Sequence, residues 1–204
     1  EAADWRGPGG RECEDRPDDE YTDRGVRTGE IDPPSGYEPE DFAVTSFEEI
    51  IEKYPEYPLN IEIKGSYPDD VPAAEELARI LAETDRLDQA VVTAFDDDLA
   101  EAFAEAAPTV SITPGLGAMT SYVLGGEALP GGRNIVQIPP EYEGIELLTA
   151  DFVQRAHGDG LVLWIWPNSR EWENAQGYER LLDLGVDGIN AADPPTAVEV
   201  VRSR

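Results

Sequence analysis

The segment "LNIEIKGSYPDD", residues 59–70, places a carboxylate and an ammonium group two residues apart. Aliphatic residues alternate there with Asn60, Glu62 and Lys64, and the side-chain period of a strand is two. In a site, Glu62 could be a hard oxygen ligand for Mg²⁺ or Ca²⁺. Lys64 could be a point charge for an anionic substrate. An internal Glu–Lys ion pair that only fills space is the alternative, and the pattern alone leaves both open.

The elements around this segment alternate between strands and helices. Segments in which apolar residues recur at helical spacing separate most of the short apolar runs. This alternation predicts a parallel sheet with helices outside it. We expect one curved sheet with strands at 59–64, 90–95, 110–113, 134–138, 161–166 and 186–190. Six strands are too few for a closed eight-stranded barrel. The choices are an open sheet, or a barrel whose first strands are absent from this chain.

Residues 1–45 differ from the rest of the chain. They are rich in Gly, Pro and acids and show no strand or helix period. We expect an irregular acidic loop or extension there, with few buried side chains, and a (β/α) barrel portion over 46–204. The barrel portion opens on a short helix in "TSFEEIIEKYP", capped by Thr45 or Ser46. The glycine-rich stretches "TPGLGAM" and "LPGGRN" lack the Gly-Lys-Ser/Thr of a Walker loop and are interpreted as loops.

Composition limits the partners. The 204 residues carry a net charge of −29, and duplex nucleic acid needs clustered Lys and Arg, so a nucleic-acid partner is not expected. No apolar run approaches the roughly 18 residues of a membrane-spanning helix. Cys13 is the only cysteine, which rules out an intramolecular disulfide. The sequence leaves the compartment and the oligomeric state open.

Three segments carry a resemblance to a known family. They are "VTSFEEIIEKYPEYPLNIEIKG", "VVTAFDDDLAEAFAEAAP" and "GDGLVLWIWPNSREWENAQGYERLLDLGVDGINAADPP". Their succession resembles that of glycerophosphodiester phosphodiesterases. The first segment contains a strand ending in Glu-x-Lys, and the second a variant of a strand ending in Ser-Phe. The third contains a Trp-containing strand followed by Gly-Val-Asp-Gly-Ile. "RGVRTGEIDPPSGYEPEDF" is similar to a loop of some bacterial members.

The resemblance implies a TIM-type barrel of lipid metabolism that hydrolyses glycerophosphodiesters to an alcohol and glycerol phosphate. It implies a divalent cation, Mg²⁺ or Ca²⁺, and a small-molecule substrate. By this resemblance Glu62 is a metal ligand and is catalytic together with Lys64. Phe95, at the Ser-Phe position, and Trp166, at the substrate mouth, would line the substrate. Trp164 lies on the same strand face as Trp166, so the period cannot separate them.

Other parts of the family's site are missing. The family's early His-Arg-Gly motif, its Glu-x-Asp pair of metal ligands and its later His-Asp have no counterpart here, and His157, the only histidine, matches neither histidine motif. The simplest expectation is that the chain begins after the first strands of the barrel and is inactive alone. A non-catalytic relative is the alternative. A Schiff-base lyase, in which Lys64 attacks a carbonyl, is a second.

Acidic residues at other strand ends have a structural interpretation. Asp96, Asp97 and Asp98 follow one strand, where acids usually cap the next helix rather than bind metal. Asn190 and Asp193 stand where the family has a Thr-Asp pair, and Asp193 precedes Pro194 as a helix N-cap would.

Overall fold

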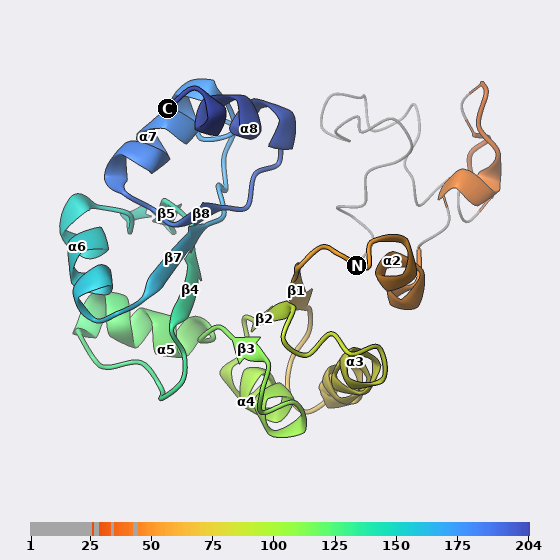
Figure 1. The fold of residues 1–204 in the computed structure, drawn as a ribbon, viewed down its shortest axis with the longest axis horizontal. Helices are drawn as coiled ribbons and strands as arrows, with labels where there is room; N and C mark the ends of the chain where they lie inside the picture. Colours follow the sequence, from red (N-terminus) through yellow and green to blue (C-terminus); the bar gives the residue numbers. More distant parts are fainter. Residues whose placement is uncertain (1–25, 27–28, 34, 43–44) are drawn as a thin grey trace. The chain divides into compact units, whose positions relative to one another are not determined.

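The structure, a computed structural model, describes residues 26, 29–33, 35–42 and 45–204 (Figure 1). Contacts divide the chain into two compact units, Glu1–Tyr57 and Pro58–Arg204, whereas the sequence pattern changes at residue 46. The prediction for residues 1–45 falls largely outside the described residues. Among the described ones, Pro39–Phe42 form a 3-10 helix, η3, and Val26 and Phe42 are buried.

The first unit also contains α2 (Phe47–Lys53), which begins with the predicted cap. The Ser46 hydroxyl accepts a hydrogen bond from the Glu49 amide at 3.2 Å, and the Glu49 carboxylate accepts one from the Ser46 amide at 2.8 Å. This reciprocal capping box satisfies two amides that the helix itself cannot pair. The hydrogen bond from the Ser46 backbone lowers the pKa of the Glu49 carboxyl.

The second unit contains the six predicted strands, which are parallel wherever they pair. Their observed bounds are β1 (Leu59–Ile63), β2 (Ala90–Ala94), β3 (Ser111–Ile112), β4 (Ile135–Ile138), β7 (Val162–Ile165) and β8 (Gly188–Ile189). Lys64 therefore follows β1 rather than ending it.

These strands form two sheets, β1-β2-β3 and β4-β7-β8, so the expectation of one curved sheet is wrong. β3 is only two residues long, and Pro114, which has no amide hydrogen, stops the ladder just beyond it. Within the described residues no ladder joins β3 to β4. The parallel α/β fold is confirmed, but the sheet topology shows no closed barrel and does not confirm an incomplete TIM barrel.

A two-stranded antiparallel hairpin, β5 (Glu141–Tyr142) and β6 (Ile145–Glu146), follows β4 and was not predicted. Glu143 and Gly144 form its turn with φ of 50° and 78°. Positive φ at both central residues is typical of the turn whose twist matches that of a hairpin.

Helices occupy most of the connections in the second unit. They are α3 (Val71–Glu83), α4 (Asp97–Ala106), α5 (Leu116–Thr120), the π-helical turn η4 (Ser121–Gly125), α6 (Ala150–Gly158), α7 (Ala175–Leu184) and α8 (Pro194–Arg202). The predicted caps are confirmed: the Asp96 side chain accepts from the Leu99 amide at 2.9 Å, and that of Asp193 from the Thr196 amide at 3.3 Å. Among the described residues, no helix is both long and apolar enough to cross a membrane.

The helix α5 corrects the interpretation of "TPGLGAM" as a loop. The carboxylate of Asp97, twenty residues earlier, accepts hydrogen bonds from the Gly117 and Ala118 amides at 2.7 and 3.1 Å. These amides lie in the first turn of α5, where no helical carbonyl can pair with them. Asp97 therefore holds the start of α5, a role that local sequence does not reveal.

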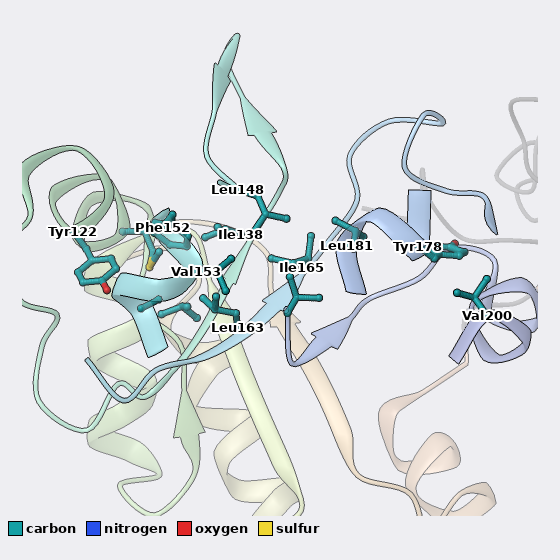
Figure 2. Close-up of a cluster of buried hydrophobic side chains, with 14 residues drawn as sticks. Tyr122, Ile138, Leu148, Phe152, Val153, Leu163, Ile165, Tyr178, Leu181 and Val200 are labelled. Atoms are coloured by element: carbon teal, nitrogen blue, oxygen red, sulfur yellow. The ribbon is translucent and has the colours of Figure 1, made fainter. Parts of the chain in front are cut away.

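The core lies between the strands and the helices that cover them. Figure 2 shows Leu163 and Ile165 of β7 near Val153 of α6 and Leu181 of α7. Leu163 and Ile165 alternate with partly exposed residues, as the period of two requires for a sheet with one covered face. In β1, Ile63 is buried, whereas Leu59 and Ile61 are half-buried.

Candidate functional site

The polar residues of β1 open into a cavity of ≈ 710 Å³ at the carboxyl ends of the strands, here called the carboxyl-edge cavity. It is lined by residues from both sheets, among them Asn60, Glu62, Lys64, Phe95, Gln137 and Trp166. All four residues predicted for the site, Glu62, Lys64, Phe95 and Trp166, therefore face the same space. In parallel α/β folds, ligands bind beyond the carboxyl ends of the strands.

Glu62 and Lys64 form an ion pair within this cavity. The Lys64 Nζ lies 2.8 Å from a Glu62 carboxylate oxygen, with 63% of the lysine side chain and 31% of the glutamate side chain exposed. An exposed pair of this kind adds little to stability, roughly 0–1 kcal/mol. Lys64 has two further N–H donors and stays accessible to a ligand.

The turn after Lys64 depends on glycine. Gly65 has φ +125°, and an added Cβ would lie 2.1 Å from an oxygen of the Asp70 carboxylate. The same carboxylate accepts a hydrogen bond from the Ser66 amide at 2.8 Å. Gly65 and Asp70 thus turn the chain sharply away directly after Lys64 and fix where its side chain leaves the backbone.

Two aromatic rings adjoin the ion pair. The ring centroids of Phe95, which follows β2, and Trp166, which follows β7, lie 6.1 Å apart at an interplanar angle of 63°. The Lys64 ammonium lies 5.9 Å from the centroid of the Phe95 ring. An edge-to-face aromatic pair next to a cation makes a wall that is apolar yet favourable for positive charge.

Three amide side chains, from β1, β4 and the end of β8, form a cluster within the cavity that sequence reasoning did not assemble. Gln137 Nε2 donates to Asn60 Oδ1 at 2.8 Å, and Asn190 Nδ2 donates to Gln137 Oε1 at 2.8 Å. Asn60 Nδ2 also approaches Asn190 Oδ1 at 3.2 Å. The cluster connects the two sheets through side chains, whereas the described residues form no backbone ladder between them. Its signal was Gln137, the polar residue in the alternating strand "NIVQIP".

Glu173 was also missed, and it organises the loop after β8. Its carboxylate accepts hydrogen bonds from the Tyr178 hydroxyl and, at 3.0 Å, from the Ala192 amide. The Tyr178 oxygen in turn accepts from the Asp193 amide at 3.2 Å. Burial, and then the hydrogen bond to Glu173, raise the pKa of the Tyr178 phenol. Glu173 lines the cavity, but its carboxylate is already engaged.

His157 does not approach this cavity. Its Nε2 lies 3.0 Å from the Asp187 carboxylate, which also accepts a hydrogen bond from the Leu163 amide at 2.8 Å. Asp187 directly precedes β8 and Leu163 lies near the start of β7, so this pair belongs to the amino ends of the strands. Trp164, the alternative to Trp166, lies over Gly188, where an added Cβ would be 2.7 Å from its ring. Unlike Trp166, it is not a cavity residue.

A resident divalent cation does not fit the donors that the structure describes. Mg²⁺ and Ca²⁺ take about six or more oxygen ligands, usually with several carboxylates. The described residues bring no three His, Cys, Asp or Glu side chains together in a way that could hold a metal ion. Glu62, the expected ligand, already faces an ammonium group.

The fold is similar to that of solved glycerophosphodiester phosphodiesterases. The enzyme from Parabacteroides distasonis superimposes with a TM-score of 0.58 and 19% identity over 81% of this chain and 59% of its own. That from Agrobacterium tumefaciens gives 0.57 and 17% identity over 79% and 63%. A Galdieria sulphuraria protein assigned the same activity gives 0.59 and 19% over 76% and 62%. The family resemblance of the sequence is thus supported at the level of the fold.

The chain spans about three fifths of the length of these structures. No protein-family model matches the sequence, and no curated protein matches it.

Proposed function

We propose that the carboxyl-edge cavity is the substrate-binding part of a glycerophosphodiester hydrolase site. One observation carries the proposal: an accessible ammonium, a carboxylate and an aromatic wall share one cavity at the carboxyl ends of parallel strands. The fold shared with glycerophosphodiester phosphodiesterases supports the same substrate class.

Lys64 would contact the non-bridging oxygens of the phosphodiester. Its ammonium can keep the Glu62 contact and still donate to the phosphate, because it carries three N–H donors. As the phosphorus is attacked, negative charge grows on these oxygens, and a fixed cation stabilises that charge. Phe95 and Trp166 would pack against the alcohol part of the diester.

Hydrolysis also needs proton transfer. Water attacks phosphorus, the bond to the alcohol oxygen breaks, and one proton passes from the water to the leaving alkoxide to give the alcohol and glycerol phosphate. Glu62 is the carboxylate beside Lys64 that could accept this proton. Because the described donors do not fit a cation, these steps use only side chains and water. Metal dependence stays an expectation from the family resemblance.

The proposal is tested by calorimetric titration with glycerophosphocholine. We expect Lys64→Met to raise the dissociation constant at least tenfold, since a hydrogen bond to a charged group contributes roughly 1.5–3 kcal/mol. Lys53→Met is the matched control, because Lys53 is the only other lysine and does not line the described cavity. If the chain turns the diester over, the release of glycerol phosphate should be slower in Glu62→Gln than in wild type.

Two results would overturn this assignment. One is glycerophosphocholine binding that Lys64→Met leaves unchanged. The other is borohydride trapping of a keto substrate on Lys64, which would indicate a lyase instead. A nucleophilic lysine is a neutral amine, usually in an apolar pocket, whereas Lys64 is exposed and lies beside a carboxylate.

A further inference from the structure

Part of the lining of the carboxyl-edge cavity is aliphatic and exposed, and it is called here the aliphatic wall. Leu116, Leu124 and Ile145 line it with 41%, 63% and 48% of their surface exposed. Among the described residues, these are the only leucine and isoleucine side chains that are exposed. Single exposed aliphatic residues are ordinary, but three leucine and isoleucine side chains around one cavity, with no other exposed leucine or isoleucine in the described chain, indicate an apolar ligand.

The fold already has its core contacts without these side chains. The same helical segment buries Met119 and Tyr122 against the core, so Leu116 and Leu124 are not needed to anchor it. The Tyr122 hydroxyl also donates to the Asp159 carboxylate at 2.8 Å. Leu116 and Leu124 are therefore presented outward by a segment that is held in place from beneath.

The hairpin that carries Ile145 is fixed as well. Tyr142 and Ile145 are cross-strand partners on either side of the two-residue turn. The Asn168 amide group donates to the Glu141 carbonyl at 2.7 Å, and the Leu147 amide donates to the Pro140 carbonyl at 2.9 Å. Hydrogen bonds at the base of the hairpin thus hold Ile145 in place. A preformed apolar surface binds apolar groups without the entropy cost of ordering it first.

The same cavity is lined by this aliphatic wall and by Lys64, so a ligand that fills it would carry both an anionic group and a hydrocarbon chain. Resting on the proposed function, we propose that the substrate is a glycerophosphodiester that keeps one acyl chain, the chemistry of a lysophospholipid. The acyl chain would lie against Leu116, Leu124 and Ile145. The volume of ≈ 710 Å³ lies within the roughly 300–1,000 Å³ of sites for small organic ligands.

The net charge of the chain disfavours a ligand that is presented by an anionic membrane. The chain carries a net charge of −29, and a surface of anionic lipids would repel it. Docking on an anionic bilayer is therefore disfavoured, and the proposal commits to a single dissolved lysophospholipid molecule with a zwitterionic head group.

The test compares dissociation constants of the full chain for glycerophosphocholine and for hexanoyl, octanoyl and decanoyl lysophosphatidylcholine, each below its micelle concentration. We expect affinity to rise with chain length, by up to about fourfold per methylene. The double variant Leu124→Ser, Ile145→Ser should reduce the ratio of the glycerophosphocholine to the decanoyl dissociation constant at least tenfold. Val201→Ser is the control, because Val201 is 56% exposed on α8 and does not line the cavity.

Three outcomes would overturn the inference. The first is equal affinity for all chain lengths, and the second is binding only to micelles or zwitterionic vesicles. The third is a dimer in sedimentation that the double variant dissociates, which would show that a second copy covers the wall. Failure of the proposed function looks different. In that case octyl glucoside, which has a chain but no phosphate, would compete fully, and Lys64→Met would bind the decanoyl ligand as the wild type does.

Discussion

Two ion pairs at opposite ends of the strands differ in how much water surrounds them. Lys64 and Glu62 lie just beyond and at the carboxyl end of β1, and the lysine is mostly exposed. Arg133 lies two residues before β4, its side chain is only 6% exposed, and its guanidinium contacts the Glu101 carboxylate of α4 at 2.6 Å. A buried cation needs its partner, because solvation lost on burial is replaced only by that contact.

The amino ends of the strands thus use charge to fix structure. The Asp187 carboxylate accepts from the Leu163 amide and contacts His157, while the Asp187 amide donates to the Leu163 carbonyl at 2.9 Å. At the carboxyl ends, the charges of Lys64 and Glu62 face a cavity. Substitutions at the amino ends should therefore change stability, and substitutions at the carboxyl ends should change binding.

The largest loss of stability is expected for Asp187→Ala. It removes the acceptor of the Leu163 amide, and Leu163 is a fully buried residue of β7. A buried amide without a partner costs about 1–3 kcal/mol, and bonds to charged acceptors lie in the upper part of that range. Chemical denaturation should show a loss of about 2–3 kcal/mol, with Asp187→Asn intermediate because its oxygen still accepts.

Gly188→Ala should come next, at about 2 kcal/mol. The added methyl group would lie 2.7 Å from the Trp164 ring, and crowding of this kind costs roughly 1–3 kcal/mol. Gly144→Ala is the comparison at an unobstructed glycine: nothing lies within 4 Å of its added methyl, so only the strain of φ +78° acts. Equal denaturation midpoints for Gly188→Ala and wild type would show that Trp164 moves freely.

The third prediction compares the ion pairs directly. Glu101→Gln should cost about 1–2 kcal/mol, because it leaves the buried Arg133 without its carboxylate, although Glu101 itself is largely exposed and screened. Glu62→Gln should cost less than about 1 kcal/mol. Denaturation curves of both variants measure the difference, and a larger loss for Glu62→Gln would reverse the comparison.

The sequence predicted the elements well because their signals are local. Alternation of apolar residues placed all six parallel strands to within a residue or two, and short-range hydrogen bonding fixed the caps at Ser46, Asp96 and Asp193. It also brought Glu62, Lys64, Phe95 and Trp166 to one cavity, since the carboxyl ends of parallel strands share an edge. Their chemical roles stay predictions.

What the sequence missed depends on contacts between distant residues. The hydrogen bond that the Gly117 amide of α5 donates to Asp97 spans twenty residues, and the amide cluster joins Asn60 to Gln137 and Asn190 across 77 and 130 residues. Strand periodicity gives the covered face of each strand but not its neighbour, so it could not show that, among the described residues, β3 and β4 do not pair with each other. The metal role expected of Glu62 stays a prediction, because the described residues place no further carboxylate beside it to complete a cation site.

The last effect is absent at neutral pH and appears only at alkaline pH, and it involves one tyrosine at each end of the strands. Tyr178 donates to Glu173 near the carboxyl ends, and Tyr122 donates to Asp159 near the amino ends. Burial, and then the neighbouring carboxylate, raise the pKa of each phenol in the folded chain. The neutral phenol is therefore favoured by folding.

The sign of the pH dependence follows from this direction. Below the unfolded pKa of about 10, both tyrosines are neutral folded or unfolded, and stability does not depend on them. Above it, the unfolded chain loses protons that the folded chain keeps, so stability falls by up to about 1.4 kcal/mol per pH unit for each tyrosine. Denaturation at pH 9, 10 and 11 should show a smaller decline in Tyr178→Phe and in Tyr122→Phe than in wild type. Because the pKa of Tyr178 in the folded chain is raised further than that of Tyr122, Tyr178→Phe should reduce the decline in stability over the wider range of pH. Parallel curves of stability against pH for all three proteins would show that the fold holds neither phenol neutral.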